Sequence, residues 1–412
     1  MPARTLLTAE ILSIGSELTA GETRDTNASE LARSLTGRGV EVRRLQGLPD
    51  VLAAVADAYR AALDTADLVV STGGLGPTPD DLTREAIAAV TGERPEVDAG
   101  LERWLRGLWA RRDMPFPEIN LKQAWLIPSA TAIPNDNGTA PGWWVDRPDG
   151  RVIAALPGPP REMRPMWTGW VLPRLETRGL GRDVEIRTLR LAGIGESQAA
   201  DILGDDLLRG SNPSVATYAR ADAVDVRISA VADGAAGGRT AAQIADAAER
   251  FVLERLGDHV WGRGDMSWAT AIGERLEALG WQLAIAEIGT GGVFAALLGD
   301  VPWVRCAETR AGDEADGDGG DLEGRAERAR ASGGCEVGIA VRVTARGDDT
   351  AVSVAIVSPH GSHRERRLAF LGGSLGRTRA ALAAAAILLA ELRRAADARP
   401  DRLPQPSEEI VR

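Results

Sequence analysis

The stretch that decides the fold runs from Asp67 to Thr83 and reads DLVVSTGGLGPTPDDLT. Its first half is a short apolar run that stops at glycines, which is typical of a central strand in a parallel sheet. A helical pattern, DDLTREAIAAVTG, overlaps its end. Glycines between a strand and a helix let a phosphate approach backbone N–H groups, and the helix offers the positive end of its dipole. The stretch therefore predicts an α/β domain with an anion site after this strand.

The same order of strand and helix occurs twice before this stretch. The segments AEILSI (9–14) and VEVRRLQ (40–46) predict strands, and each precedes a helical pattern. Alternating strands and helices predict a doubly wound sheet, whose ligands bind at the carboxyl ends of the strands. We therefore expect the loops around Glu17, Asp50 and residues 73–81 to meet at one edge of the sheet.

Length and composition exclude several classes of protein. The 412 residues suffice for two or three domains of about 150 residues each, and 44% are apolar. Acidic residues outnumber basic ones by 59 to 48, so the net charge of −11 argues against direct nucleic-acid binding. The chain has no apolar run of about 18 residues and no signal-peptide pattern, so we expect a cytoplasmic protein without a membrane contact. Two cysteines, Cys306 and Cys335, do not make a disulfide framework.

The sequence pattern changes twice along the chain. Residues 1–170 form the predicted α/β domain, and residues 171–262 alternate strands and helices as a small α+β domain. Residues 265–396 predict a further α/β domain, which contains an Asp/Gly-rich loop at 311–324. The tail 397–412 is expected to be disordered.

Two adjacent carboxylates, Asp80 and Asp81, follow the glycine-rich loop. A carboxylate pair beside a phosphate repels it unless a divalent cation lies between them. The pair therefore predicts Mg²⁺ ligands or a base that orients water. The alternative is that Asp81 is only the N-cap of the next helix, with Thr83 as its capping partner.

Three more features of the first domain are candidates for the same site. Lys122 is the single lysine among 48 basic residues. A compact ammonium in an arginine-rich chain indicates a phosphate contact, although an ordinary surface lysine is the alternative. Two loops of glycine and proline, NGTAPG (137–142) and LPGPPRE (156–162), are candidate walls of a nucleotide site, and each alone predicts only a turn.

Taken together, these segments resemble the CinA family (competence/damage-inducible protein A). Six ordered motifs are similar to its N-terminal, molybdopterin-binding-like domain: AEILSIGSEL, DTN, TGGLGPTPDDLT, NLKQAW, NGTAPG and LPGPPREMRPMW. TLRLAGIGES and LLRGSNPSVATYAR are similar to its KH-type middle domain. That domain has no basic GXXG loop here, so the resemblance does not imply RNA binding.

The resemblance implies a metal-dependent pyrophosphatase that cleaves ADP-ribose to AMP and ribose 5-phosphate. Mg²⁺ or another divalent metal is the expected cofactor, with K⁺ as a second candidate, and the expected assembly is a homodimer. Molybdopterin-type domains use one aspartate after the second strand and one after the glycine-rich loop, which correspond to Asp50 and Asp81. We expect Asp81, Asp50 and Lys122 to be catalytic, and Asp81 and Asp80 to be metal ligands. The expected substrate-binding residues are Gly15, Glu17, Asn27, Thr72, Gly73, Gly74, Gly76, Asp80, Gly138, Thr139, Gly158, Pro159 and Glu162.

Residues 265–396 resemble the nicotinamide mononucleotide deamidase domain of the same family but depart from it at the active site. The family segment A-E-S-C-T-G-G, whose serine is the nucleophile, reads AEIGTGG here, and an isoleucine cannot attack a carbonyl. The family's Tyr…Lys segment has no counterpart, and VRVTAR (341–346) stands where its T-G-I-A-G-P loop falls. We expect an inactive deamidase site at Glu287, Ile288, Gly289, Thr290, Gly291 and Gly292.

Two other functions fit the same residues. One is the binding of molybdopterin or a nucleotide, including adenylyl transfer, as in other relatives of the first domain. The other is a non-enzymatic scaffold linked to competence or DNA recombination. The glycines and aspartates of the first domain favour a nucleotide-like small molecule as the partner.

Overall fold

The computed structural model describes residues 4–234, 238–312 and 321–398. It has two compact units, Met1–Glu185 with Val231–Ala242 and Ile186–Ala230 with Gln243–Arg412. Most of the Asp/Gly-rich segment 311–324 and of the tail 397–412 lies outside the described residues. Within the described ranges, no helix is both long enough and apolar enough to span a bilayer.

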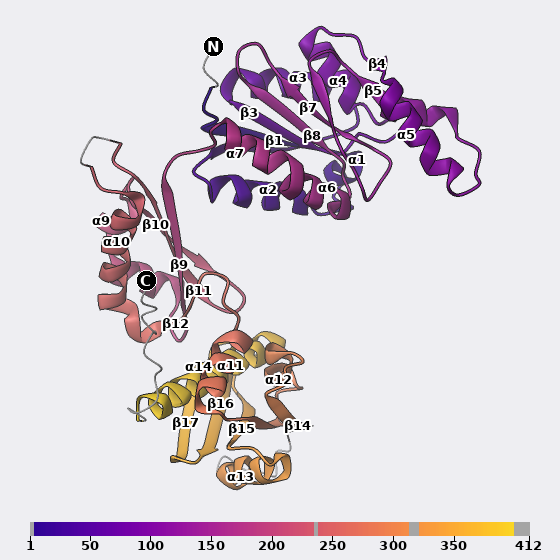
Figure 1. The fold of residues 1–412 in the computed structure, drawn as a ribbon. Helices are drawn as coiled ribbons and strands as arrows, with labels where there is room; N and C mark the ends of the chain where they lie inside the picture. Colours follow the sequence, from indigo (N-terminus) through magenta and orange to yellow (C-terminus); the bar gives the residue numbers. More distant parts are fainter. Residues whose placement is uncertain (1–3, 235–237, 313–320, 399–412) are drawn as a thin grey trace, which may run out of the picture. The chain divides into compact units, whose positions relative to one another are not determined.

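The first unit is built on a six-stranded sheet in the order β2-β1-β3-β8-β7-β6 (Figure 1). Four strands are parallel: β1 (Thr8–Ile14), β2 (Glu41–Leu48), β3 (Leu68–Thr72) and β8 (Val152–Leu156). Two antiparallel strands extend one edge: β7 (Gly142–Asp146) and β6 (Ala130–Ile133). The predicted α/β fold is confirmed, and the sheet has an antiparallel edge in addition.

Helices cover both faces of this sheet, because alternate residues of each strand point to opposite sides. Ile11 and Val70 are buried in one core with α2 (Thr26–Thr36), α6 (Pro160–Met166) and α7 (Leu172–Arg178). Leu12 and Val69 are buried in the other core with α3 (Leu52–Thr65) and α4 (Thr83–Thr91). Two short helical segments complete this part: α1 (Ser16–Thr19) and the π-helix η2 (Trp167–Val171).

A segment between α4 and β6 leaves the sheet and projects from one end of the unit (Figure 1). It consists of β4 (Glu96–Val97), α5 (Ala99–Ala110), the 3-10 helix η1 (Glu118–Ala124) and β5 (Trp125–Leu126). Only Leu105 of α5 is buried, whereas η1 buries Asn120, Gln123 and Ala124. The return through η1 therefore places the NLKQAW motif against the domain.

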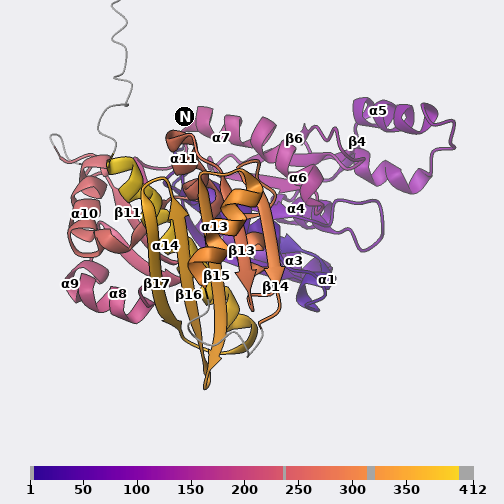
Figure 2. The same cartoon turned by 90° about the horizontal axis from the view of Figure 1, so that it is seen from below.

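The second compact unit holds two sheets, each with its own helices. The first sheet has the order β10-β11-β9-β12, and the second has the order β14-β13-β15-β16-β17 (Figure 2). The elements of the first are β9 (Val184–Leu191), α8 (Glu196–Leu203), α9 (Asp205–Leu208), β10 (Ser214–Ala219), β11 (Val224–Val231), α10 (Ala241–Leu256), η3 (Gly257–His259) and β12 (Val260–Arg263). The elements of the second are α11 (Trp268–Leu279), β13 (Leu283–Ile288), α12 (Val293–Leu298), β14 (Val304–Arg310), α13 (Leu322–Gly333), β15 (Val337–Arg346), β16 (Asp349–Ser358), β17 (Gly361–Ala369) and α14 (Gly373–Asp397).

Two details of this unit differ from the sequence pattern. The helical pattern of AADILGDDLL (199–208) is divided into α8 and α9, because Gly204 between them has φ +80°. The last helix, α14, includes Asp397, which was expected to begin the disordered tail. In the last sheet, β13 runs parallel to β14 and β15, and the hairpins to β16 and β17 are antiparallel.

Candidate functional site

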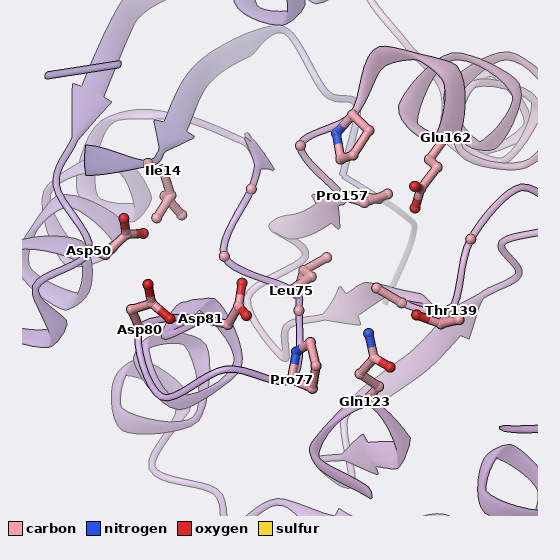
Figure 3. Close-up of a pocket in the computed structure, with 18 of the residues that line it drawn as sticks. Ile14, Asp50, Leu75, Pro77, Asp80, Asp81, Gln123, Thr139, Pro157 and Glu162 are labelled. Carbon is pink, nitrogen blue, oxygen red and sulfur yellow. The ribbon is translucent and has the colours of Figure 1, made fainter. Parts of the chain in front are cut away.

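A cleft of about 620 Å³ lies at the carboxyl ends of the parallel strands of the first unit (Figure 3). The loop after each of β1, β2, β3 and β8 contributes to its wall, and the loop before β7 closes one side. Ten of the lining residues are labelled in Figure 3: Ile14, Asp50, Leu75, Pro77, Asp80, Asp81, Gln123, Thr139, Pro157 and Glu162. The loops around Glu17, Asp50 and residues 73–81 meet at this edge of the sheet, as expected.

The glycine-rich loop is shaped by close backbone contacts. Gly73 has φ +96°, and a Cβ there would lie 2.0 Å from the carbonyl oxygen of Ile14. The carbonyls of Gly73 and Gly74 both accept from Thr83, one from its hydroxyl and one from its amide. These bonds fix the loop against the start of α4.

Three consecutive amides follow this fixed point. Gly74, Leu75 and Gly76 line the cleft, and among the described residues none of their amides has a protein acceptor. Successive unpaired backbone N–H groups in a turn form an anion-binding concavity. The loop therefore has the donors that the sequence pattern predicts for a phosphate.

Three carboxylates lie together on one side of the cleft, as Figure 3 shows: Asp50, Asp80 and Asp81. The amide and the hydroxyl of Thr78 both donate to Oδ2 of Asp81, and Oδ1 has no partner within the described ranges. Asp81 does not cap α4, whose N-cap is Leu82 without a side-chain bond, so the capping alternative is wrong. A Cβ at Gly76 would lie 2.3 Å from Asp81 Oδ2, so glycine leaves room for this carboxylate.

The other two carboxylates are also oriented by their neighbours. Oδ2 of Asp50 accepts from the amide of Ser16 at 2.8 Å. The Thr78 hydroxyl, which also faces Asp80, and the charge of Lys122 hold the pKa of Asp80 below its usual value. Asp80 is therefore an anion throughout the neutral range.

The opposite wall is held by a buried pair of polar side chains. Asn135 donates to Glu162 Oε2 at 2.8 Å and to the carbonyl of Ala140 at 3.0 Å. A Cβ at Gly138 would lie 2.0 Å from Glu162 Oε2, so any larger residue there would displace the Glu162 carboxylate. The pair thus fixes the NGTAPG loop to the start of α6, and Thr139 of that loop faces the cleft.

Eleven of the thirteen expected substrate-binding residues line the cleft: Gly15, Glu17, Gly73, Gly74, Gly76, Asp80, Gly138, Thr139, Gly158, Pro159 and Glu162. The catalytic candidates Asp50 and Asp81 line it as well. Asn27 and Thr72 do not: Asn27 donates to the carbonyl of Gly158 at 2.7 Å, and Thr72 is buried in β3. They support the loops instead.

Lys122 also lies outside the lining. Its ammonium pairs with Glu85 at 2.7 Å and donates to the carbonyl of Thr78 at 3.2 Å, and only 11% of its side chain is exposed. These two partners leave little of the charge for a substrate. The structure therefore places Lys122 behind the loop that carries Asp80 and Asp81, outside the residues that line the cleft.

Sequence reasoning missed three residues of this region: Arg84, Arg112 and Gln123. Arg84 is fully buried, and its guanidinium donates to the carbonyls of Leu75 at 2.7 Å and Pro141 at 3.0 Å. Burial lowers the pKa of Arg84 to about 10, so it stays charged at neutral pH. Arg112 and Gln123 line the cleft itself. Gln123 follows Lys122 in the NLKQAW motif, and this motif was the feature of the sequence that could have indicated its place in the cleft.

The carboxylates suit a divalent cation only together with a ligand. No group of three or more His, Cys, Asp or Glu residues in the described part of the chain could hold a metal ion. Mg²⁺ is commonly bound by one or two carboxylates together with phosphate oxygens and waters. Asp80 and the unpaired Oδ1 of Asp81 fit that smaller ligand set.

The segment expected to be a degenerate deamidase site lies at the end of β13. Ile288 is buried, and the carboxylate of Glu287 accepts from the amides of Phe294 at 3.0 Å and Ala295 at 2.9 Å. Thr290 accepts from the amide of Gly292, and Gly289 and Gly291 have positive φ. VRVTAR (341–346) continues β15 without forming a loop. The carboxylate of Glu287 therefore accepts hydrogen bonds from amides at the N-terminus of α12.

Comparisons with known proteins agree with the motifs. A family model described as "Probable molybdopterin binding domain" matches residues 10–177, and one described as "Damage-inducible protein CinA KH domain" matches residues 186–262. CinA-like proteins of Deinococcus deserti and Deinococcus radiodurans are each 49% identical to this chain, over 72% of both chains. A crystal structure of a CinA protein of unknown function from Thermoplasma acidophilum is 35% identical, covers 40% of this chain and 98% of its own, and has a TM-score of 0.38. On the identity and coverage of the two Deinococcus proteins, the chain belongs to the family of CinA-like proteins.

Proposed function

We propose that the first unit hydrolyses the pyrophosphate bond of ADP-ribose, or of a closely related nucleotide diphosphate, in a reaction that depends on a divalent metal. One observation carries this proposal: the cleft combines three carboxylates with three amides that have no acceptor in the part of the chain that the structure describes. Amides of this kind bind phosphate, whereas carboxylates repel it. Together they favour a phosphate bridged to the protein by a cation.

The residues of the cleft have different roles in the proposed reaction. Asp80 and Asp81 would hold the metal, which when bound polarises the phosphoryl oxygens. Asp50, oriented by the amide of Ser16, would accept the proton of the attacking water. The amides of Gly74 and Gly76 would stabilise the negative charge that grows on the phosphate.

Lys122 has a positioning role in this proposal. Its bond to the carbonyl of Thr78 supports the turn whose amide and hydroxyl hold Asp81. The ion pair with Glu85 keeps the ammonium in place. Loss of this ammonium would therefore loosen the turn that carries Asp80 and Asp81, but it would remove no direct contact with the substrate.

The test is AMP release from ADP-ribose by the full chain with Mg²⁺, Mn²⁺ or Co²⁺, each with and without K⁺. The variant Asp81→Asn keeps the size of the side chain and removes its charge. We expect metal-dependent AMP release that falls at least about 100-fold in Asp81→Asn, in line with the loss of a group that acts in the transition state. Asp57→Asn, on the surface of α3, is the matched control. Folded protein that makes no AMP with any of these metals would refute the proposal.

A second candidate is the binding of molybdopterin without hydrolysis, which the family model matched to residues 10–177 favours. The same cleft would then hold a pterin with its phosphate at the three amides. Saturable binding of molybdopterin by protein that releases no AMP is the result that supports this candidate.

We further propose that residues 265–396 do not deamidate nicotinamide mononucleotide. Ile288 supplies no nucleophile, and the carboxylate of Glu287 is engaged by two amides of α12. The full chain is therefore expected to release no ammonia from this substrate.

A further inference from the structure

One side chain in the wall of the cleft has hydrogen-bonding groups that the protein does not use. Gln123 lines the cleft and is only 2% exposed, yet its Oε1 has no hydrogen-bond partner among the described residues. A buried carbonyl without a partner costs free energy that an apolar side chain of the same size would not cost. Packing alone therefore does not account for a glutamine at this position.

The backbone on both sides of Gln123 is firmly held. Lys122 is bound to Glu85 and to the carbonyl of Thr78. Ala124 is fully buried, and its carbonyl accepts from the amide of Asp98 at 2.8 Å. The carboxamide is therefore presented to the cleft by a rigid part of η1, as a specific contact to a ligand requires.

The position of Gln123 separates it from the phosphate chemistry. Figure 3 shows its amide nitrogen directed toward the cavity beside Pro77 and Thr139, with the three aspartates on the other side of the glycine-rich loop. Pro77 also lines the cleft and offers it an apolar surface. A flat ring that lies against the proline would bring its edge to Gln123.

We propose that Gln123 is a specificity-determining residue that recognises the ring of the substrate by an edge where an amino group adjoins a ring nitrogen, as in adenine. A carboxamide has donors and an acceptor in one plane and pairs with such an edge through two hydrogen bonds. The inference rests on the proposed function for the identity of the substrate, and it adds how the site selects the base.

The experiment compares two substrates and three proteins. ADP-ribose carries the ring, and a dialkyl pyrophosphate carries the same kind of scissile bond without a ring. The variant Gln123→Met fills nearly the same volume without hydrogen bonds, and Gln46→Met makes the same change on β2, outside the cleft lining. We expect Gln123→Met to raise KM for ADP-ribose about 10- to 100-fold, the range for loss of one bidentate contact, with kcat nearly unchanged. Its kinetics on the dialkyl pyrophosphate should match those of the wild type.

Binding of AMP, measured by calorimetry, tests the same residue without hydrolysis. Weaker AMP binding in Gln123→Met, by the same factor as KM, supports the role of Gln123 even if the wild type releases no AMP from ADP-ribose. Equal AMP affinity in the wild type and Gln123→Met overturns it, and so does an equal loss of activity on both substrates, which would indicate a structural role. Failure of the proposed hydrolysis is thereby distinguished from failure of this inference.

Discussion

Replacing Arg84 by methionine should loosen the cleft while changing the overall stability of the protein only modestly. The guanidinium is fully buried and joins the glycine-rich loop at Leu75 to the NGTAPG loop at Pro141. Hydrogen bonds to a charged group contribute about 1.5–3 kcal/mol each, so losing both costs roughly 3–6 kcal/mol. Burial lowers the pKa of Arg84 to about 10, which corresponds to about 3 kcal/mol of desolvation that the variant no longer bears. The net change in the free energy of unfolding is therefore about 0–3 kcal/mol.

Within the two loops nothing offsets the loss of these hydrogen bonds. In Arg84→Met the carbonyls of Leu75 and Pro141 no longer have the guanidinium as a donor. Hydrogen exchange measured by mass spectrometry should show faster exchange in the amides of Asp81 and Thr83, which are bonded inside the first loop, to the carbonyls of Thr78 and Gly74. Loss of about 1.5–3 kcal/mol of local stability corresponds to a roughly 10- to 100-fold higher exchange rate. AMP release should fall with it, because Asp81 moves with this loop.

Two controls separate the bridge from a general effect. Arg60→Met makes the same chemical change on the surface of α3, where Arg60 pairs with Asp57, and should leave exchange in both loops unchanged. Arg84→Lys keeps a charge but provides one compact donor group in place of a fork, so it should give an intermediate exchange rate. Wild-type exchange rates in both loops of Arg84→Met would refute the reasoning, whatever happens to the overall stability.

Three other changes test separate parts of the structure. Gly73→Ala should destabilise the first unit by more than about 2 kcal/mol in urea unfolding, because the added methyl group would lie 2.0 Å from the Ile14 carbonyl oxygen. Gly47→Ala, which adds the same group in open space, should not, and equal stability of the two variants would contradict this prediction. Thr78→Val should let the pKa of Asp80 rise toward its ordinary value, so the acid limb of the pH–rate profile should move to higher pH; an unmoved limb would mean that ionisation of Asp80 does not control the rate. Ile288→Ser should not release ammonia from nicotinamide mononucleotide, because the adjacent Glu287 remains bound to the amides of α12; ammonia formed at an enzymatic rate would show that the nucleophile was the only missing group.

The sequence predicts those parts of the fold and the site that depend on local pattern. The short apolar run of β3 and the glycines after it are recognisable alone, because burial on both faces and positive φ restrict which residues fit. The N-cap of α2 is less clear from the sequence, because Asp25, Thr26 and Asn27 are all capping residue types; in the structure Asp25 caps the helix. Asn27 is occupied elsewhere, since its amide binds the carbonyl of Gly158, far along the chain.

The parts that escaped prediction depend on contacts between distant segments. Arg84 reads as an ordinary charged residue of a helix, and only folding brings the carbonyls of Leu75 and Pro141 to it. The sequence of α5 is amphipathic, but it does not reveal that this segment leaves the sheet and buries only Leu105 of the helix. Lys122 was expected to contact phosphate, and its pairing with Glu85 is a tertiary contact that spacing does not reveal.

The ion pair of Lys122 and Glu85 also makes the chain unusually simple to probe by chemical labelling. Because Lys122 is the single lysine, a reagent that acylates side-chain amines has one target in the 412 residues. That amine is mostly buried and paired, so its rate of acylation reports how often the turn behind the aspartates opens. The protein therefore carries its own site-specific sensor of this turn, without any introduced cysteine or tag.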